Sequence, residues 1–417
     1  MKRFIPNPLT VLTVLLFVGG PDLSYGFDWP QWRGPDRSDV SKEVDLLKSW
    51  PAGGPKRLWL YKNAGNGYSG PAIADTKLFT VGTRDQTECL LALDANTGNE
   101  LWTAKAGSVL KNGWGDGPRG TPAVDGDRVY AFSGRGNLIC ARVADGKVLW
   151  QQTMKELGGQ TPGWGYTESV LVDDNRVVCT PGGAQGALAA LDKMTGKIIW
   201  QSKEFTDPAH YSSIIAADHN GTRQYIQLTE RNLVGISAKD GKLLWKSPWT
   251  GQTAVIPTPI FHNGYVYVTS GYGAGCKLIK LGAEHQVSDI YDNKLMKNHH
   301  GGVVRIGDYI YGYDDGGGWL CQNFMTGEKV WSEKKALGKG AVTSADGLLY
   351  CLEEKSGTVV LIEASPKGWK EHGRLTLDPQ TSIRNPQGRI WTHPVISNGK
   401  LYLRDQDLIF CYDIKQS

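Results

Sequence analysis

The residues of this sequence that are best suited to contact a ligand are aromatic, cationic and acidic side chains that recur once per period of 40 to 50 residues. Aromatic faces pack on apolar rings and attract cations, while fixed charges orient polar groups. This mixture indicates binding more directly than any one reaction. The candidate binding residues are Tyr68, Arg119, Tyr166, Glu168, Tyr211, His299, His300, Asp314, Asp315, Lys339, Trp391 and His393.

Sequence motifs for catalysis or metal binding are weak. The segment 65–70 matches G-x-G-x-x-G, but an expected strand follows it, so the helix N-terminus that would hold a phosphate is missing. His299 and His300 are adjacent, point to opposite faces of a strand, and have no carboxylate at ligand spacing. The sequence also lacks the P-loop, H-E-x-x-H, C-x-x-C and G-x-S-x-G patterns. It therefore predicts no catalytic residue and no cofactor-binding or metal-binding residue.

An internal repeat positions these residues. Five segments of the form LDANTGNELW carry a glycine and, four residues later, a tryptophan. They end at Trp102, Trp150, Trp200, Trp245 and Trp331, and the first four tryptophans are 48, 50 and 45 residues apart. The last gap of 86 residues equals two periods, and the stretch 286–297 within it has no clear strand pattern, which marks a degenerate copy.

A second unit precedes each of these segments. Residues 69–81, 120–132, 257–269 and 391–403 each predict an apolar strand, a tight turn and an alternating strand, and looser copies start near residues 168, 212, 300 and 340. The eighth copy lacks a final strand, which Arg57-Leu58-Trp59 can supply. We therefore predict an all-β fold, a single eight-bladed β-propeller of four-stranded blades that is closed by an N-terminal strand.

The repeat resembles the pyrroloquinoline-quinone-type (PQQ-like) β-propeller family with its tryptophan-docking motif. The best matches run from Ala92-Leu93-Asp94 to Gly98 and Trp102, and from Ala190-Leu191-Asp192 to Gly196 and Trp200, within a resemblance that covers residues 57–414. It implies that each docking tryptophan packs between neighbouring blades against a glycine-containing turn. Structural roles are therefore expected for Trp59, Trp102, Trp150, Trp200, Trp245 and Trp331.

The same resemblance has two functional branches. Quinoprotein dehydrogenases of this type hold PQQ and calcium, and they carry a disulfide between adjacent cysteines; the nearest cysteines here, Cys321 and Cys351, are thirty residues apart. The propeller subunit of the outer-membrane β-barrel assembly machine has the same repeat and no quinone. Because fold does not fix function, we expect a binding or scaffold protein without bound quinone, and we keep a PQQ-dependent alcohol or sugar dehydrogenase as the alternative.

The seven cysteines do not indicate a disulfide framework. Cys140, Cys321 and Cys411 occupy one small-residue register in the third strand of their blades, where Ala92 and Ala190 stand in other blades. Cys321 and Cys351 lie in adjacent blades, and theirs is the one disulfide that we consider. We expect at least five free thiols.

The chain divides into three parts. Residues 1–26 are expected to form a secretory signal peptide, with Lys2 and Arg3 before a ten-residue apolar run that is too short to span a bilayer. Residues 27–56 form an N-terminal arm, whose Trp29 and Trp32 are expected to pack on the outside of the ring. Residues 57–417 form the propeller. The protein is therefore expected to be exported to the periplasm or the cell exterior, with no transmembrane segment after signal cleavage.

The expected partner is an exported protein or polymer. The chain has 46 basic and 42 acidic residues, a formal net charge of +4, and no concentrated basic face that would indicate nucleic acid. Propellers bind at the mouth of the central channel, where the starts of the innermost strands meet the loops between second and third strands. The candidate residues come from blades on different sides of the ring, so we expect them to form a broad partner surface rather than one pocket.

Overall fold

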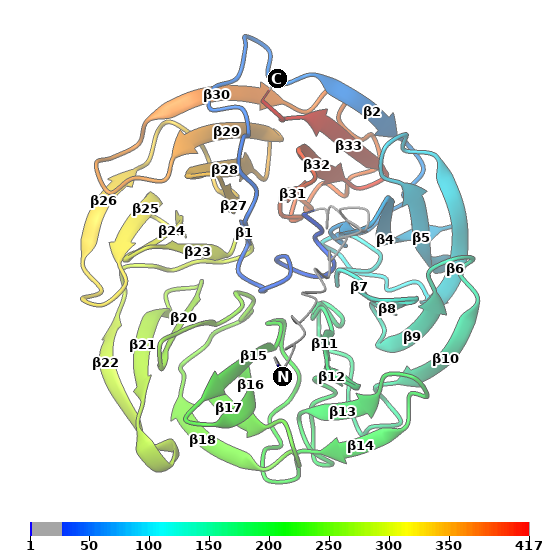
Figure 1. Ribbon diagram of the computed structural model, residues 1–417, viewed down its shortest axis with the longest axis vertical. Helices are drawn as coiled ribbons and strands as arrows, with labels where there is room; N and C mark the ends of the chain where they lie inside the picture. Colours follow the sequence, from blue (N-terminus) through cyan, green and yellow to red (C-terminus); the bar gives the residue numbers. More distant parts are fainter. Residues whose placement is uncertain (2–26, 417) are drawn as a thin grey trace.

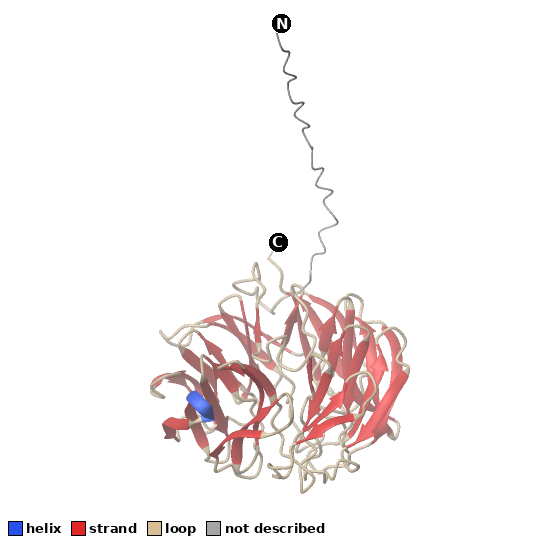
Figure 2. Cartoon of the chain, turned by 60° about the horizontal axis from the view of Figure 1, so that its bottom comes forward, coloured by secondary structure: helices blue, strands red, loops and turns tan. Residues whose placement is uncertain are grey.

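The computed structural model describes Met1 and residues 27–416, and it arranges the latter as a ring of eight sheets around a central axis (Figure 1). The strands run between two faces covered by loops, as the tilted view shows (Figure 2). Within the described residues the one helical element is a 3-10 turn, η1 (Ala283–His285). The predicted all-β, eight-bladed propeller is confirmed, while residues 2–26 of the expected signal peptide lie outside the described residues.

Each blade is an antiparallel sheet of four strands in chain order, apart from the last blade. Blades 1 to 4 consist of β3 (Ala72–Ala74), β4 (Lys77–Arg84), β5 (Thr87–Asp94), β6 (Glu100–Ser108); β7 (Ala123–Asp125), β8 (Arg128–Phe132), β9 (Asn137–Arg142), β10 (Val148–Thr153); β11 (Leu171–Asp173), β12 (Arg176–Cys179), β13 (Ala189–Asp192), β14 (Ile198–Gln201); and β15 (Ile215–His219), β16 (Thr222–Leu228), β17 (Asn232–Ser237), β18 (Leu243–Pro248).

Blades 5 to 7 follow the same order. They consist of β19 (Ile260–His262), β20 (Tyr265–Ser270), β21 (Gly275–Leu281), β22 (Val287–Asn293); β23 (Val303–Ile306), β24 (Tyr309–Asp314), β25 (Gly318–Asn323), β26 (Lys329–Glu333); and β27 (Gly340–Ala345), β28 (Leu348–Glu353), β29 (Thr358–Glu363), β30 (Glu371–Thr376). The stretch 286–297 that lacked a strand pattern thus contains the outer strand β22.

The ring is closed by a strand from the other end of the chain. Blade 8 contains β31 (Val395–Ser397), β32 (Lys400–Asp405) and β33 (Leu408–Asp413), and its outer strand is β2 (Arg57–Tyr61). Trp59 pairs with Cys411 across β2 and β33. The predicted closure by an N-terminal strand is confirmed, and it leaves blade 8 with the same four strands as its neighbours.

The middle strands of each blade are buried on both faces, because a neighbouring blade covers each side. In β5, the run Leu90 to Leu93 is fully buried, which explains its continuous apolar sequence. The outer strands have one free face, and Leu101 of β6 is 47% exposed. The apolar character of each strand in the repeat therefore follows how deeply that strand is buried between the neighbouring blades.

Aromatic side chains of the outer strands join each blade to the next. Five indole N–H groups donate to backbone carbonyls of the following blade: Trp59 to Ala95 (3.2 Å), Trp102 to Val143 (3.0 Å), Trp150 to Lys193 (3.0 Å), Trp200 to Ala238 (3.1 Å) and Trp331 to Ser365 (2.9 Å). Gly98 has a φ of +74°, and a Cβ placed there would lie 2.7 Å from the Trp59 ring. Glycine is needed in this turn both for its backbone conformation and for the approach of the ring.

Two blades vary this interblade contact. In blade 5, Tyr291 takes the tryptophan position: its hydroxyl donates to the Phe324 carbonyl (2.8 Å), and its ring lies against Gly327. Trp245 of blade 4 donates instead to Gln224 of its own blade (2.5 Å). The tyrosine explains why the fifth copy of the repeat was not recognisable from its tryptophan.

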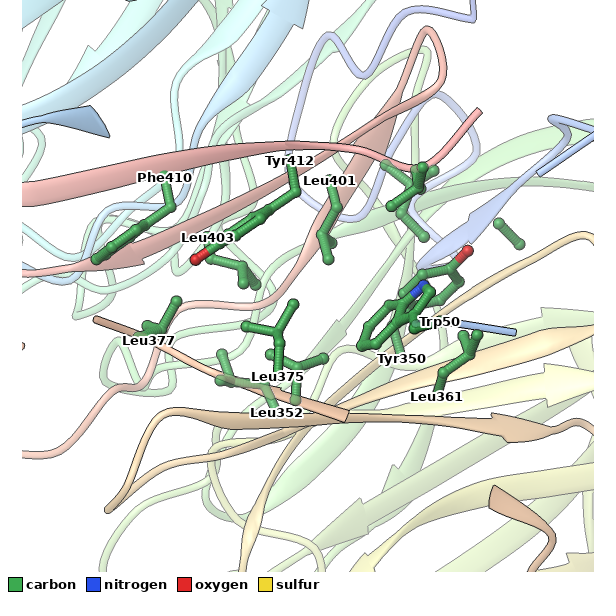
Figure 3. Close-up of a cluster of buried hydrophobic side chains, with 14 of the residues drawn as sticks. Trp50, Tyr350, Leu352, Leu361, Leu375, Leu377, Leu401, Leu403, Phe410 and Tyr412 are labelled. Atoms are coloured by element: carbon green, nitrogen blue, oxygen red, sulfur yellow. The ribbon is translucent and has the colours of Figure 1, made fainter. Parts of the chain in front are cut away.

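Blade 7 obtains its aromatic residue from the arm. The position that pairs with Leu361 is Gly373, which has no side chain, and Trp50 of the arm fills the space. The Trp50 ring lies 5.9 Å from Tyr350, as the Trp59 ring does from Tyr402 in blade 8. Figure 3 shows Trp50 within the apolar cluster between blades 7 and 8.

Residues 29–41 of the arm lie inside the ring, so the expectation that Trp29 and Trp32 pack outside was wrong. Trp29 is 2% exposed and exchanges backbone hydrogen bonds with Ile73 of β3. Further along, β1 (Val40–Ser41) pairs in parallel with β27, the innermost strand of blade 7. Figure 1 shows this segment crossing the centre of the ring. The channel of a propeller offers unpaired inner strand edges, and the arm satisfies several of them.

The cysteines follow the register predicted for them. Cys140, Cys321 and Cys411 each pair with the aromatic position of the neighbouring outer strand, at Trp150, Trp331 and Trp59. All seven cysteines are free, including Cys351, which was the possible partner of Cys321. No helix of the described residues is long and apolar enough to cross a membrane.

We expect Trp50→Ala to destabilise the protein by about 3–5 kcal/mol, because it empties a core site between two blades. The effect should match that of Trp102→Ala, which removes the equivalent residue from within a blade. Val44→Ala, at a residue of the arm that is 60% exposed, serves as the control. Thermal unfolding followed by circular dichroism would measure all three. A Trp50→Ala protein that melts with the wild type would contradict the role of the arm in joining blades 7 and 8.

Cys→Ala at positions 140, 321 and 411 should each cost only about 1 kcal/mol, because alanine already occupies this register in blades 1 and 3. Thiol titration of denatured, unreduced protein should find at least five free thiols. Three disulfides in that titration would show the register interpretation to be wrong.

Candidate ligand-binding cavity

A cavity of about 300 Å³ lies at one mouth of the channel. All eight connections between successive blades contribute to its wall, and the arm contributes one residue. The lining residues are Trp32, Tyr68, Trp114, Arg119, Trp164, Thr167, Ser169, Tyr211, Ser213, Ala254, Ile256, Tyr272, His299, His300, Lys339, Glu354, Gln387, Arg389 and Trp391. Its volume is at the lower end of the range for small-molecule sites.

A continuous row of aromatic rings forms one side of this cavity. The Tyr68 and Trp391 ring centres are 4.9 Å apart, and Trp391 stacks on His300 at 4.5 Å with planes inclined by 23°. His300 lies 3.7 Å from His299, whose ring in turn contacts Tyr272 edge-on at 4.6 Å. These five rings come from three different connections and one loop of blade 5, so the ring fold assembles a surface that no single blade carries.

Three cations reach the cavity. Arg119 donates to the carbonyls of Gly117 (2.6 Å) and Gly115 (2.9 Å), and its guanidinium lies 5.2 Å from the centre of the Tyr68 ring. Arg389 donates only to backbone carbonyls of its own loop. Among the described residues neither arginine has a carboxylate within ion-pair distance. Lys339 does, since it pairs with Asp315 at 2.7 Å.

The histidines of the wall are neutral. Burial, and then the charge of Lys339, lowers the pKa of His299 to about 3, and burial lowers the pKa of His300 well below its usual value. The Lys339 ammonium lies 2.9 Å from His299 Nδ1 and can only donate. His299 Nδ1 is therefore the acceptor, and its Nε2 carries the proton.

One carboxylate, Glu354, faces these groups from the loop between β28 and β29. Burial raises its pKa to about 7, although Lys339 opposes the shift. Its Oε2 lies 3.9 Å from His300 Nδ1. Near neutral pH the site therefore contains three cations and a single acid that is only partly ionised.

Several buried polar atoms at this site have no hydrogen-bond partner among the described residues. They are Nε2 of His299, Nδ1 of His300 and Nε1 of Trp391. Unsatisfied buried polar atoms are rare in folded proteins, because each costs the desolvation of the group. Three of them on one wall of a cavity indicate that a ligand or ordered solvent satisfies them.

The arm separates the cavity from the rest of the channel. Trp32 lines the cavity, donates from Nε1 to the Thr258 hydroxyl (2.9 Å), and lies 4.5 Å from the His393 ring. Trp32 also lines a second hollow, of about 10 Å³, among residues that include Trp29 and Asp39. Trp32 and the arm thus form the inner end of the cavity.

Buried charged side chains hold the arm in place next to the inner end of the cavity. Arg33 donates to the Val303 carbonyl (2.7 Å) and lies 3.2 Å from Asp39. Asp39 also lies 2.8 Å from His393 Nδ1, and His393 Nε2 contacts the His300 carbonyl (3.0 Å). A chain of polar contacts thus connects the arm to a residue of the cavity wall.

Seven of the twelve candidate residues line the cavity: Tyr68, Arg119, Tyr211, His299, His300, Lys339 and Trp391. The expectation that residues from different blades would stay spread over a broad surface was wrong, because the connections between blades turn inward and bring their side chains to one cavity. Asp315 contacts this group through its ion pair with Lys339.

The other four candidates have structural surroundings. Tyr166 stacks on Phe132 and donates to the Pro181 carbonyl. Glu168 is fully buried and accepts from the Thr180 backbone, and burial raises its pKa to about 8. Asp314 pairs with Lys297 at 3.1 Å. His393 contacts the arm as described above.

Other lining residues were missed in the sequence. They include Trp32, Trp114, Trp164, Tyr272 and Arg389. A sequence signal existed for three of them, since Trp114, Trp164 and Tyr272 each stand between two glycines. Glycine allows the sharp turn that projects the ring, and the three G-aromatic-G triplets lie outside the strand repeats. Trp32 could not be found in this way, because it belongs to no repeat.

The family model described as outer membrane protein assembly factor BamB matches residues 86–333, more than half of the chain. The chain belongs to this family of PQQ-like propellers. Among individual relatives, it is 28% identical over 137 residues to BamB of Marinobacter adhaerens, covering 33% of this chain and 29% of that protein. It is 22% identical over 232 residues to tetrathionate hydrolase of Acidithiobacillus ferrooxidans, covering 52% and 44%. The matched regions span less than half the length of both relatives.

Solved structures share the BamB-family fold. BamB from Moraxella catarrhalis superposes with a TM-score of 0.62 at 15% identity, covering 87% of this chain and 98% of that one. A quinohemoprotein alcohol dehydrogenase from Comamonas testosteroni gives 0.59 at 11% identity, covering 94% and 81%. At such low identity these likenesses concern the fold alone.

The cavity of this BamB-family chain does not fit a calcium-held quinone. Calcium takes six to eight oxygen ligands, whereas Glu354 is the one carboxylate among the lining residues, and it lies among cations. Within the described residues no three histidine, cysteine, aspartate or glutamate side chains are grouped to hold a metal. The donor set therefore suits an anion better than a metal ion.

Glu354→Gln should make the protein relatively more stable as pH rises. A carboxyl whose folded-state pKa is raised to about 7 binds more protons in the folded than in the unfolded state between about pH 4.5 and 7. The wild type therefore loses stability over this window, and the variant loses less. We expect the difference in unfolding free energy to grow by about 1–3 kcal/mol and to level off above pH 7. Parallel urea titrations at several pH values would measure it, and a constant difference would contradict the raised pKa.

Proposed function

We propose that this protein is an exported binding or scaffold propeller that works without bound quinone and engages an exported protein or polymer at its central cavity. The observation that carries the proposal is the convergence of all eight blade connections on one cavity that is rich in aromatic rings and cations. Such a cavity fixes a ligand by packing and charge, and it offers no arrangement of nucleophile, base and oxyanion donors.

The composition of the site supports binding over catalysis. The two neutral histidines have their pKa values far below neutrality, so neither is suited to take up a proton near pH 7. Glu354, with a pKa of about 7, is the one group whose charge changes there. It has no second carboxylate or nucleophile beside it among the lining residues.

The relatives support a scaffold role in a general way. Several relatives are named outer membrane protein assembly factor BamB, a name that describes a role in assembly, and they match the repeat region of this chain. The expected signal peptide agrees with an exported location. The quinohemoprotein neighbour supports the alternative of a PQQ-dependent oxidoreductase, but the lack of a calcium donor set at the cavity weighs against it.

Incubation with PQQ and calcium should give no stoichiometric chromophore and no dye-linked oxidation of alcohols or sugars, because Glu354 is the one carboxylate among the lining residues that could hold the ion, and it lies among cations. Absorbance after gel filtration and a dye-reduction assay would measure both. Arg119→Gln should weaken capture of an exported partner, whereas Arg142→Gln, at a surface ion pair, should leave capture unchanged. Melting temperatures measure separately the loss of the Arg119 hydrogen bonds to the Gly117 and Gly115 carbonyls. Calcium-dependent quinone binding with turnover would contradict the proposal and favour the dehydrogenase.

A further inference from the structure

The wall of the cavity presents donors that lack acceptors. His299 Nε2 carries a proton, because its Nδ1 accepts from Lys339, and this N–H has no partner among the described residues. The indole N–H of Trp391 makes no complete hydrogen bond, and the one acceptor beside it is the Glu354 carboxylate, whose pKa it lowers against the effect of burial. Arg119 and Arg389 satisfy part of their donors with backbone carbonyls only. The ligand that completes this site must be rich in acceptors.

The charge of the site gives the second property of the ligand. Arg119, Lys339 and Arg389 face the cavity against the single carboxylate Glu354, and Lys339 is already paired with Asp315. Two guanidinium groups without a carboxylate partner favour an anion. Arginine is also the cation that binds carboxylate and sulfate in a fixed two-point geometry.

The aromatic residues give the third property. Trp32 lies at the inner end of the cavity, Trp391 and Tyr68 line one side, and Trp114, which is 47% exposed, lies towards solvent. Rings arranged around a hollow pack well on flat or gently curved groups with C–H faces. Sugar rings have such faces, and their hydroxyl groups both donate and accept, which suits Glu354 and His300 Nδ1 together with the unpartnered donors.

We propose that the cavity binds the terminal unit of an acidic saccharide, a sugar ring that carries a carboxylate or a sulfate. The acid group contacts Arg119 and Arg389, the ring packs on Trp391 and Tyr68, and hydroxyl groups accept from His299 and Trp391. The site takes a chain end, because Trp32 and the arm close the channel behind it. This inference rests on the proposed function and chooses the polymer over the protein as the partner.

The test compares soluble probes that separate these three properties. Digalacturonate carries carboxylates, a sulfated disaccharide carries sulfate, and cellobiose is neutral. Benzene-1,3,5-tricarboxylate is a flat anion without hydroxyl groups, and triglutamate represents an acidic protein segment. Tryptophan fluorescence and calorimetry would report binding. We expect at least one acidic disaccharide to bind at least about tenfold more tightly than cellobiose, the tricarboxylate and triglutamate, and the preference between the first two probes identifies carboxylate or sulfate.

Variants test the assigned contacts. Arg389→Gln should weaken binding of the acidic disaccharide about tenfold, and Trp391→Phe, which keeps a ring but removes the N–H, about 2–10-fold. Arg142→Gln and Trp369→Phe, whose residues lie outside the cavity, are the matched controls and should bind normally. Melting temperatures near that of the wild type show that the variants are folded.

The remaining outcomes overturn the inference in distinguishable ways. Equal binding of cellobiose removes the role of the cations, and preferred binding of triglutamate moves the partner to an acidic protein. If no saccharide binds to the folded protein at millimolar concentration, the ligand class is wrong while the proposed binding function stands. Calcium-dependent binding of PQQ in the same assay overturns the ligand class and the proposed function together.

Discussion

The contact between an aromatic side chain of one blade and the backbone of the next is the interaction on which the ring depends. In five blades a tryptophan indole N–H donates to a backbone carbonyl of the next blade. In blade 5 the hydroxyl of Tyr291 makes the corresponding contact with blade 6. Each of these contacts combines burial of a large apolar ring with a satisfied polar end. Each of the five tryptophans has a small residue opposite it in its own sheet, and most of these contacts also need a glycine turn in the neighbouring blade, which explains the spacing of the sequence repeat.

The arm meets the same requirement at one point of the ring and then serves a second purpose. Trp50 supplies the aromatic ring that blade 7 lacks, and Trp32, less than twenty residues earlier in the chain, forms the inner end of the cavity. The stability of the ring and the shape of the cavity therefore depend on one continuous segment. A substitution that breaks the buried Arg33–Asp39 ion pair within the arm should therefore affect both the stability of the ring and the shape of the cavity.

The blades could be predicted from the sequence because their pattern reports local packing. A residue such as Cys140 is small wherever it pairs with a tryptophan of the same sheet, and this constraint repeats in six of the eight blades. Closure by Trp59 followed from a strand missing at one end and present at the other. These features need only neighbouring strands, and the repeat contains that information.

The cavity was only partly predictable. Side chains at the starts of inner strands, such as Tyr68 and His299, were found because they share a register with the repeat. The convergence of these side chains on one cavity could not be predicted, since it depends on how far each connection between blades turns inward. The position of the arm could not be read from Trp29 or Trp32, because apolar residues outside a repeat fit an outer surface and a channel equally well in sequence terms.

Closure of the ring by β2 has a consequence for folding. Residues 57–61 precede blades 1 to 7 in the chain, yet their pairing partner, β33, follows these blades. Until these strands pair, β2 and Trp50 lack their final neighbours, while blades 1 to 6 can already stack. Contacts of such large sequence separation slow folding and leave strand edges exposed. The folding chain therefore passes through an open arc of blades with two free edges, and the pairing of β2 with β33 converts this arc into the closed ring.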